Sequence, residues 1–175
     1  MPSPHLHHHP TPLLPLIALS ISSALLGATL TFSSITIPAL LSPSPPPALS
    51  SIHQRSIFRT LYTRCTIPFP LISLLASSMY FYLSFTSRGT DIPVHHWTGK
   101  AVKYVIAAVS SASVVPWTFL VMGRGIRRLM APEEEEKAGE WVREELARWG
   151  WGNLGRAGMQ AVAVVVGGWE MVMGE

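Results

Sequence analysis

The stretch LLPLIALSISSALLGATLTFSSITIPALL, residues 13–41, contains no charged residue. A helix crosses the hydrocarbon core of a bilayer with about 20 apolar residues, so this stretch predicts a membrane span. A signal peptide fits less well, because residues 1–12 hold no Lys or Arg and the apolar run is too long. Proline interrupts a helix, so Pro38 and the segment SPSPPP at 42–47 predict where the span ends.

Three further apolar runs follow along the chain. Residues 66–87 and 104–123 are uncharged, and each is long enough to span a bilayer. Residues 157–173 form the weakest candidate, because the run is short and contains adjacent glycines and Glu170. Glu170 lies near the C-terminus, so we expect it to face the headgroups, although a role as an intramembrane acid stays open. Tyrosine is enriched at the depth of the lipid headgroups, and we expect Tyr80 to lie at that depth.

The composition also indicates a membrane protein. Charged residues make up 13% of the chain, against about 25% in soluble domains. The sequence therefore predicts an all-α, four-transmembrane-helix bundle as one domain at 13–173, preceded by a disordered His- and Pro-rich tail at 1–12. Cys65 is the only cysteine, which excludes an intramolecular disulfide and a cysteine-based metal site. No metal site is predicted. The sequence has no basic patch interleaved with aromatic residues, so we expect no nucleic-acid binding.

Residues 132–149, PEEEEKAGEWVREELARW, are the only strongly charged stretch. Acidic residues near its start favour a helix N-terminus. Val142, Leu146 and Trp149 form a narrow apolar stripe along this predicted amphipathic helix. The stripe predicts a helix that rests on the membrane surface, and a solvated connector helix between the third and fourth spans is an equal alternative.

The distribution of basic residues predicts the orientation of the spans. The loops between spans 1 and 2 and between spans 3 and 4 share one side of the membrane. By the positive-inside rule these loops are cytosolic and both termini lie on the opposite side. The basic residues on the predicted cytosolic side are Arg55, Arg59, Arg64, Arg124, Arg127, Arg128, Lys137, Arg143, Arg148 and Arg156, against Arg88, Lys100 and Lys103 on the other side.

Polar groups near the ends of the predicted spans are the candidates for chemistry. Pro116 has no N–H, so the backbone carbonyl one turn earlier in the third span loses its helical hydrogen bond. The side chains of Trp117 and Thr118 offer an N–H and an O–H nearby. These groups fit either a polar pocket between helices or an ordinary proline kink. Asn153 and Arg156 are three residues apart and share a face of a helix. Arg156 suits either a headgroup contact or the stabilisation of an oxyanion.

His96 is the candidate general base. It follows His95 just before the third span, at interfacial depth, and histidine exchanges protons near neutral pH. None of the strong catalytic motifs is present: the sequence has no nucleophile elbow, phosphate loop, zinc-binding helix pair or dinucleotide fingerprint.

The order of three motifs resembles the fungal anthrone oxygenase-like family of small four-span membrane proteins. The motifs are GATLTFSSITIPALL at 27–41, PWTFLVM at 116–122, and WGWGNLGR at 149–156, which contains Trp149, Asn153 and Arg156. The resemblance covers residues 13–173. The chain departs from the family after Met122, where Arg124, Gly125 and Ile126 replace the usual Pro-Thr-Asn.

The resemblance implies oxidation of an anthrone to an anthraquinone by O2, within aromatic polyketide biosynthesis and without a cofactor. The implied partners are an apolar polycyclic aromatic molecule, O2 and the lipid bilayer. His96 is the expected base, and Arg156 with Asn153 the stabiliser of the enolate oxygen. The expected substrate-binding residues are Pro116, Trp117, Thr118, Met122 and Trp149, with Trp117 as a stacking wall. Ile126 in place of Asn favours the alternative, a non-catalytic membrane scaffold of the same fold, and a transporter or channel is disfavoured by the scarcity of intramembrane charges.

Overall fold

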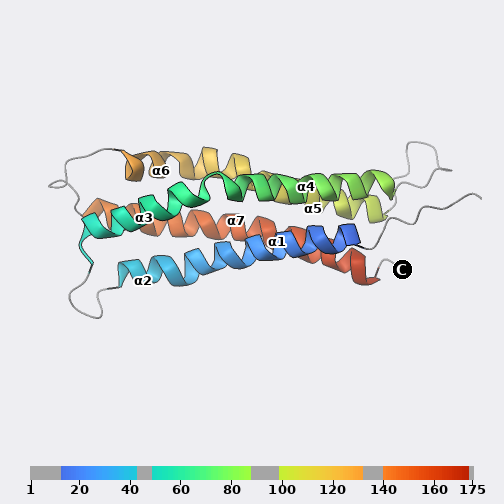
Figure 1. Ribbon diagram of the computed structural model, residues 1–175, viewed down its shortest axis with the longest axis horizontal. Coiled ribbons are helices and arrows are strands. Elements are labelled where there is room, and N and C mark those ends of the chain that lie inside the picture. The colour runs from blue at the N-terminus through green and yellow to red at the C-terminus, as the bar shows by residue number, and fades with distance from the viewer. Residues whose placement is uncertain (1–12, 43–48, 88–98, 132–139, 174–175) are drawn as a thin grey trace, which may run out of the picture.

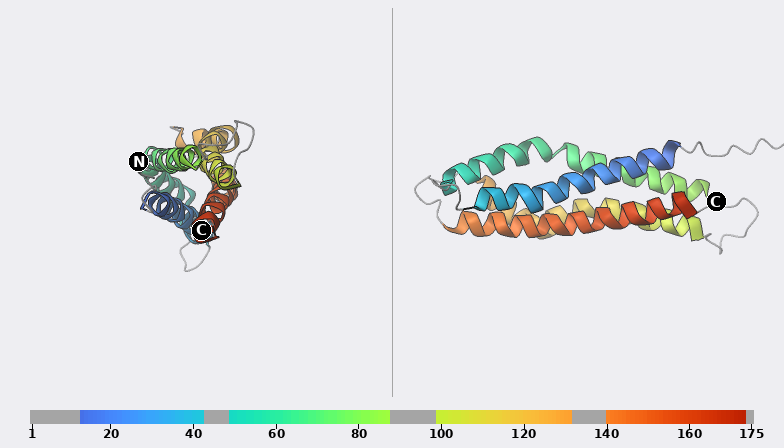
Figure 2. Two further views of the ribbon diagram at one scale, coloured as in Figure 1. Left: turned by 90° about the vertical axis from the view of Figure 1, so that its right-hand side faces the viewer. Right: turned by 90° about the horizontal axis from the view of Figure 1, so that it is seen from below.

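The structure is a computed structural model that describes residues 13–42, 49–87, 99–131 and 140–173. In these residues all regular structure is helical, which confirms the all-α prediction. Four helical rods lie side by side in one elongated bundle (Figures 1 and 2). The first rod is α1 (Leu13–Thr31), η1 (Phe32–Thr36) and α2 (Ile37–Leu41), and the second is α3 (Ser51–Cys65) and α4 (Pro68–Thr86). The third is α5 (Gly99–Trp117), η2 (Thr118–Met122) and α6 (Gly123–Met130), and the fourth is the single helix α7 (Glu140–Met173).

Three of these rods are long and apolar enough to cross a membrane: Leu13–Leu41, Ser51–Thr86 and Gly99–Met130. These candidate spans are consistent with an integral membrane protein. The helix α7 is not among them, because its first half is rich in charge and Glu170 lies near its end. The fourth predicted span, 157–173, therefore stays a prediction.

Two rods contain a π-helical segment next to a proline. Pro116 has no N–H to donate to the preceding turn, and its ring crowds that turn. The backbone widens just after it, in η2, and the Thr118 hydroxyl donates to the Val114 carbonyl at 2.7 Å. In the first rod, η1 ends just before Pro38, and the helix continues to Leu41. The rod thus passes through Pro38 and ends at Leu41, which is the predicted end of the uncharged run 13–41.

The interior of the bundle has two apolar cores with a polar layer between them. One core, near the C-terminal end of α7, includes Ala18, Tyr80 and Ala163, and the other, at the opposite end, includes Ile37 and Leu146. Small side chains let the helices approach closely where a membrane removes the usual hydrophobic driving force. The buried polar residues at intermediate positions along the rods are Thr29, Ser33, Ser73, Ser77, Ser111, Asn153, Arg156 and Gln160.

Hydrogen bonds between helices satisfy most of this polar layer. The Ser73 hydroxyl donates to the Ser111 carbonyl at 2.7 Å, and the Ser77 hydroxyl donates to the Ala108 carbonyl at 2.9 Å. The Gln160 amide donates to the Ser73 hydroxyl at 3.0 Å. Such bonds fix α4, α5 and α7 against one another, because a polar group without a partner is costly in an apolar interior.

The charged stretch near residue 140 is not a separate surface helix. Residues 140–149 are the start of α7, which continues without a break to Met173, while residues 132–139 lie outside the described residues. Val142 and Leu146 are fully buried in the second core. The prediction that this apolar stripe rests on the membrane surface is wrong, because α3 and α6 extend far enough to cover it.

Three residues that we expected in a loop or at the ends of spans, Arg55, Tyr80 and Glu170, are buried in the bundle. The Arg55 Nε donates to the Leu129 carbonyl at 2.9 Å, so this buried arginine caps the C-terminal end of α6. Tyr80 is buried against Gly167. Glu170 is 4% exposed and accepts a hydrogen bond from Lys103 Nζ at 2.7 Å, so its carboxylate pairs with a lysine of α5. Its expected position near the headgroups stays a prediction.

Candidate functional site

A narrow pocket lies where the helical rods lose their regularity. It is bordered by the π-helical turn η1, the break between α3 and α4, the residue Thr118 at the start of η2, and the middle of α7. Its cavity volume is about 50 Å³, so it is a slot between side chains. Irregular helical turns are frequent at functional sites. The lining residues are Phe32, Thr36, Ile37, Leu40, Phe58, Leu61, Tyr62, Cys65, Thr66, Phe69, Pro70, Thr118, Trp149, Asn153 and Arg156.

Aromatic rings form much of the wall of this slot. Phe58 meets Trp149 edge to face with ring centroids 5.2 Å apart, and Phe58 stacks on Tyr62 at 5.8 Å. Phe32 lies 6.1 Å from Phe69 and 6.5 Å from Trp149. Contacts of this kind favour flat aromatic surfaces. The slot therefore suits a planar, apolar ligand.

Arg156 places a positive charge in this aromatic slot. The residue is 8% exposed, and no carboxylate of the described residues forms an ion pair with it. Its Nε is buried without a hydrogen-bond partner there. A buried guanidinium without a counter-charge is costly. The arrangement therefore favours a ligand that brings an oxyanion to Arg156.

Asn153 orients this guanidinium. The Arg156 Nη1 donates to the Asn153 Oδ1 at 3.1 Å, which confirms that the two side chains share a face of α7. The Asn153 Nδ2 donates to the Thr29 carbonyl at 3.0 Å and to the Ser33 hydroxyl at 3.1 Å. The side chain is 1% exposed, so its amide is fixed by contacts to the first rod. Thr29 lies near the end of α1 and Ser33 lies within the irregular backbone of η1.

Tyr62 and Cys65 are the other ionisable side chains of the slot. Both come from the last turn of α3 and line the same slot as the Arg156 guanidinium. A phenol and a thiol can donate or accept a proton, so the slot has groups for proton transfer as well as for charge stabilisation.

The structure divides the predicted site residues between two places. Thr118, Trp149, Asn153 and Arg156 line the slot. Trp117, Met122 and Trp149 line a wider groove between η2, α6 and α7, and the Trp117 Nε1 donates to the Gly152 carbonyl at 2.9 Å. Pro116 lines neither space but precedes the turn that carries Thr118. His96 lies outside the described residues, so its assignment as the base stays a prediction.

The position of Ile126 bears on the alternative function. Ile126 is buried in α6 and lines the wider groove, and it is not among the residues that line the slot. The loss of the family's usual asparagine at this position therefore leaves the polar groups of Asn153 and Arg156 intact.

Sequence reasoning missed the contribution of α3 and η1 to the slot. Tyr62 and Cys65 lie in a stretch with Arg55, Arg59 and Arg64, which we interpreted as a loop. Phe32 and Thr36 lie inside the motif GATLTFSSITIPALL at 27–41, so that motif could have indicated that they belong to the site. Nothing in the sequence indicates which face of the first rod meets α7.

The family model described as anthrone oxygenase matches residues 58–166, which include every slot residue from α3, α4, η2 and α7. The noranthrone monooxygenase of Aspergillus flavus is 28% identical over 158 residues, covering 86% of this chain and 70% of that protein. No solved structure matches the chain.

Proposed function

The chain belongs to the anthrone oxygenase family, and from this premise we propose that it oxidises an anthrone to an anthraquinone with O2. The observation that carries the proposal is Arg156, a buried guanidinium that lines an aromatic slot and forms no ion pair with the described residues. An anthrone combines a flat apolar ring system with a carbonyl that becomes an oxyanion when a ring proton is lost. These two properties match the two properties of the slot.

The proposed reaction begins when His96, the predicted base, takes a proton from the anthrone CH2 group opposite the carbonyl. The resulting enolate is delocalised, and its oxygen carries charge that Arg156 stabilises at the position fixed by Asn153. The enolate transfers an electron to O2, and the two radicals combine at the former CH2 carbon to give a hydroperoxide. Loss of water leaves the second carbonyl, so one anthrone and one O2 give one anthraquinone and one water. This chemistry requires no cofactor, because the enolate itself is the reductant.

The slot must widen to admit a substrate. Pockets for drug-sized ligands hold roughly 300–1,000 Å³, against about 50 Å³ in the slot. The residues on its outer side, including Phe32, Tyr62 and Phe69, are only partly buried. Movement of these side chains away from one another would widen the slot. An apolar substrate reaches this side from the bilayer in the proposed membrane arrangement.

In that arrangement the fourth rod also crosses the membrane. Residues 157–169 of α7 are uncharged and lie alongside α1 and α5, both of which belong to candidate spans. Glu170 pairs with Lys103, which removes much of the cost of placing its charge near the end of a span. The basic end of the bundle is then cytosolic by the positive-inside rule.

Oxygen uptake by membranes that contain the chain tests the proposed function. Membranes with and without the chain receive the same hydroxylated anthrone, and the spontaneous oxidation is subtracted. We expect an O2 uptake above background with one anthraquinone formed per O2 consumed. Uptake equal to background with several anthrones, together with a stoichiometric protein partner on purification, would instead establish the scaffold alternative.

A further inference from the structure

The wider groove lies on the side of α7 that faces η2 and α6. Its volume is about 730 Å³, so it is much larger than the slot. Met122 and Ile126 give it an apolar floor, and both are buried. The groove shares Trp149 with the slot but contains neither Asn153 nor Arg156. It is therefore a separate candidate binding site.

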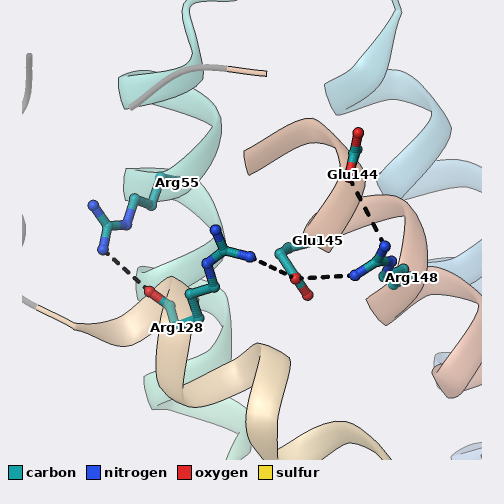
Figure 3. Close-up of polar contacts among 5 residues, drawn as sticks. All are labelled: Arg55, Arg128, Glu144, Glu145 and Arg148. Carbon is teal, nitrogen blue, oxygen red and sulfur yellow. Dashed lines mark hydrogen bonds and ion pairs between the residues drawn. The ribbon is translucent and has the colours of Figure 1, made fainter. Parts of the chain in front are cut away.

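Positive charge is in excess at the rim of this groove. Of the described residues, Arg124, Arg128 and Arg148 line it together with the carboxylate of Glu145. The Glu145 Oε1 is 3.2 Å from Arg128 Nη1 and 3.4 Å from Arg148 Nη1, so it lies between these two guanidiniums (Figure 3). Glu144 adds a longer contact of 3.9 Å to Arg148 (Figure 3). Arg124 has no ion pair or hydrogen bond from its side chain within the described part of the chain. Among the described residues, the two carboxylates of Glu144 and Glu145 cannot balance three guanidiniums, so the groove favours an anion.

The surface beside the groove is apolar. Phe119, Leu120 and Val121 are 71%, 83% and 53% exposed, and they directly precede the arginines in the third rod. Trp151 on α7 lines the groove and is 75% exposed. Exposed apolar groups in such numbers indicate contact with lipid or a partner. In a rod that is a candidate membrane span, this change from apolar to basic residues is typical of the boundary between acyl chains and headgroups.

From this combination we infer that the groove binds an anionic phospholipid. The phosphate and the charged headgroup lie at Arg124 and its neighbouring arginines, and the acyl chains run along Phe119–Val121 toward the middle of the span. A soluble anion would use the arginines but gain nothing from the exposed apolar surface. A zwitterionic lipid would use the apolar surface but would balance the positive charge less well.

Binding there would stabilise the contact between the third and fourth rods. The groove is built on the contact where the Trp117 indole donates to the Gly152 carbonyl and Met122 packs against Gly152. A lipid that contacts both α6 and α7 therefore raises the resistance of the protein to unfolding, by mass action. The inference does not depend on the proposed oxygenase activity.

A lipid titration of the purified full-length protein tests the inference. The protein in detergent, stripped of bound lipid, is titrated with phosphatidylglycerol, phosphatidylcholine of the same chains, or inorganic phosphate, and its melting temperature is followed. We expect phosphatidylglycerol to raise the melting temperature at lower concentrations than phosphatidylcholine, and phosphate to have little effect. An equal response to the two lipids, or to phosphate and phosphatidylglycerol, would overturn the inference.

Variants locate the effect. Arg124→Gln should weaken phosphatidylglycerol binding by about fivefold, because one arginine near an anionic lipid surface contributes about 1 kcal/mol. Arg64→Gln is the matched control, since Arg64 is an exposed arginine on α3 that does not line the groove. Glu145→Gln should strengthen the binding, because it releases Arg128 and Arg148 from their shared carboxylate. The comparison uses the lipid-dependent shift of each variant, so a change in its basal stability does not obscure the result. Equal shifts for Arg124→Gln and Arg64→Gln would place the lipid elsewhere.

Discussion

Arg156 and Asn153 combine a buried cation with a residue that fixes its position. Their spacing in the sequence was sufficient to predict the shared face of the helix, and the 3.1 Å hydrogen bond confirms it. The partners of Asn153, Thr29 and Ser33, are more than a hundred positions away in the chain. The sequence could not indicate them, because periodicity shows which face of a helix is buried but not which helix covers it.

Replacement of Arg156 tests its proposed role. Arg156→Gln keeps hydrogen-bonding groups near Asn153 but removes the charge, so the enolate oxygen loses its stabilisation. We expect the anthrone-dependent kcat to fall by about a hundredfold, as when one oxyanion-stabilising donor is removed. The measurement is O2 uptake at saturating anthrone, with Arg64→Gln as the control. If Arg156→Gln and the control retain equal rates, Arg156 does not stabilise the reacting oxygen.

Asn153→Asp tests the role of the Arg156 charge by neutralising it with a neighbouring carboxylate, while the guanidinium itself is kept. The new carboxylate would lie at the position of the amide that now accepts from Arg156 at 3.1 Å, and it would pair with the cation. A paired Arg156 attracts a substrate oxyanion less, so we expect at least about a tenfold loss of kcat/KM. Circular dichroism in detergent checks that the helices persist. Full turnover in a folded Asn153→Asp protein would show that a net positive charge in the slot is unnecessary.

The helices themselves show where sequence patterns succeed and where they fail. Uncharged runs predicted the apolar part of the first three rods, because only a helix satisfies its own backbone in lipid. The same rule failed for α3, α6 and the start of α7, whose charged residues suggested loops and a surface helix. Arg55 explains the failure, because its guanidinium donates hydrogen bonds to the carbonyls at the end of α6 and does not face solvent.

A close contact between α5 and α7 provides a prediction at this scale. A Cβ at Gly155 would lie 2.6 Å from the Trp117 ring, whereas a Cβ at Gly158 would have nothing within 4 Å. Gly155→Ala should therefore separate the helices and cost about 1–3 kcal/mol, as overpacked interiors do. Gly158→Ala, its control on the same helix, should keep or raise stability by up to about 1 kcal/mol through helix propensity. Melting temperatures in detergent measure both, and equal values would contradict the packing of Trp117 on α7.

The whole molecule is a bundle longer than its apolar zone. The membrane-compatible rods extend into a basic end, where α3, α6 and the first half of α7 enclose the second apolar core (Figure 1). The slot lies where this basic end meets the uncharged part of the rods. In the proposed membrane arrangement, an apolar molecule would approach the slot from the bilayer while Arg156 stays near the basic end of the bundle. Composition predicted a membrane protein but not this extension, because the buried core at residues 140–149 is hidden by charges on the opposite face of α7.

The number of spans is tested by labelling from one side of the membrane. Single cysteines at Arg148 and at Met173, in a Cys65→Ser background, replace residues that are exposed near the two ends of α7. If α7 crosses the bilayer, a membrane-impermeant maleimide added to sealed vesicles should label only one of the two. Labelling of both positions from the same side would mean that the fourth rod does not span.

The most direct measurement uses the only cysteine of the chain, Cys65, which lines the slot with Arg156. The rate of Cys65 alkylation by a small maleimide is measured with and without a hydroxylated anthraquinone, which resembles the substrate but does not oxidise further. We predict that the anthraquinone slows the alkylation of the wild-type protein several-fold and has little effect on Arg156→Gln. An alkylation rate of the wild-type protein that is independent of the anthraquinone would contradict binding in this slot.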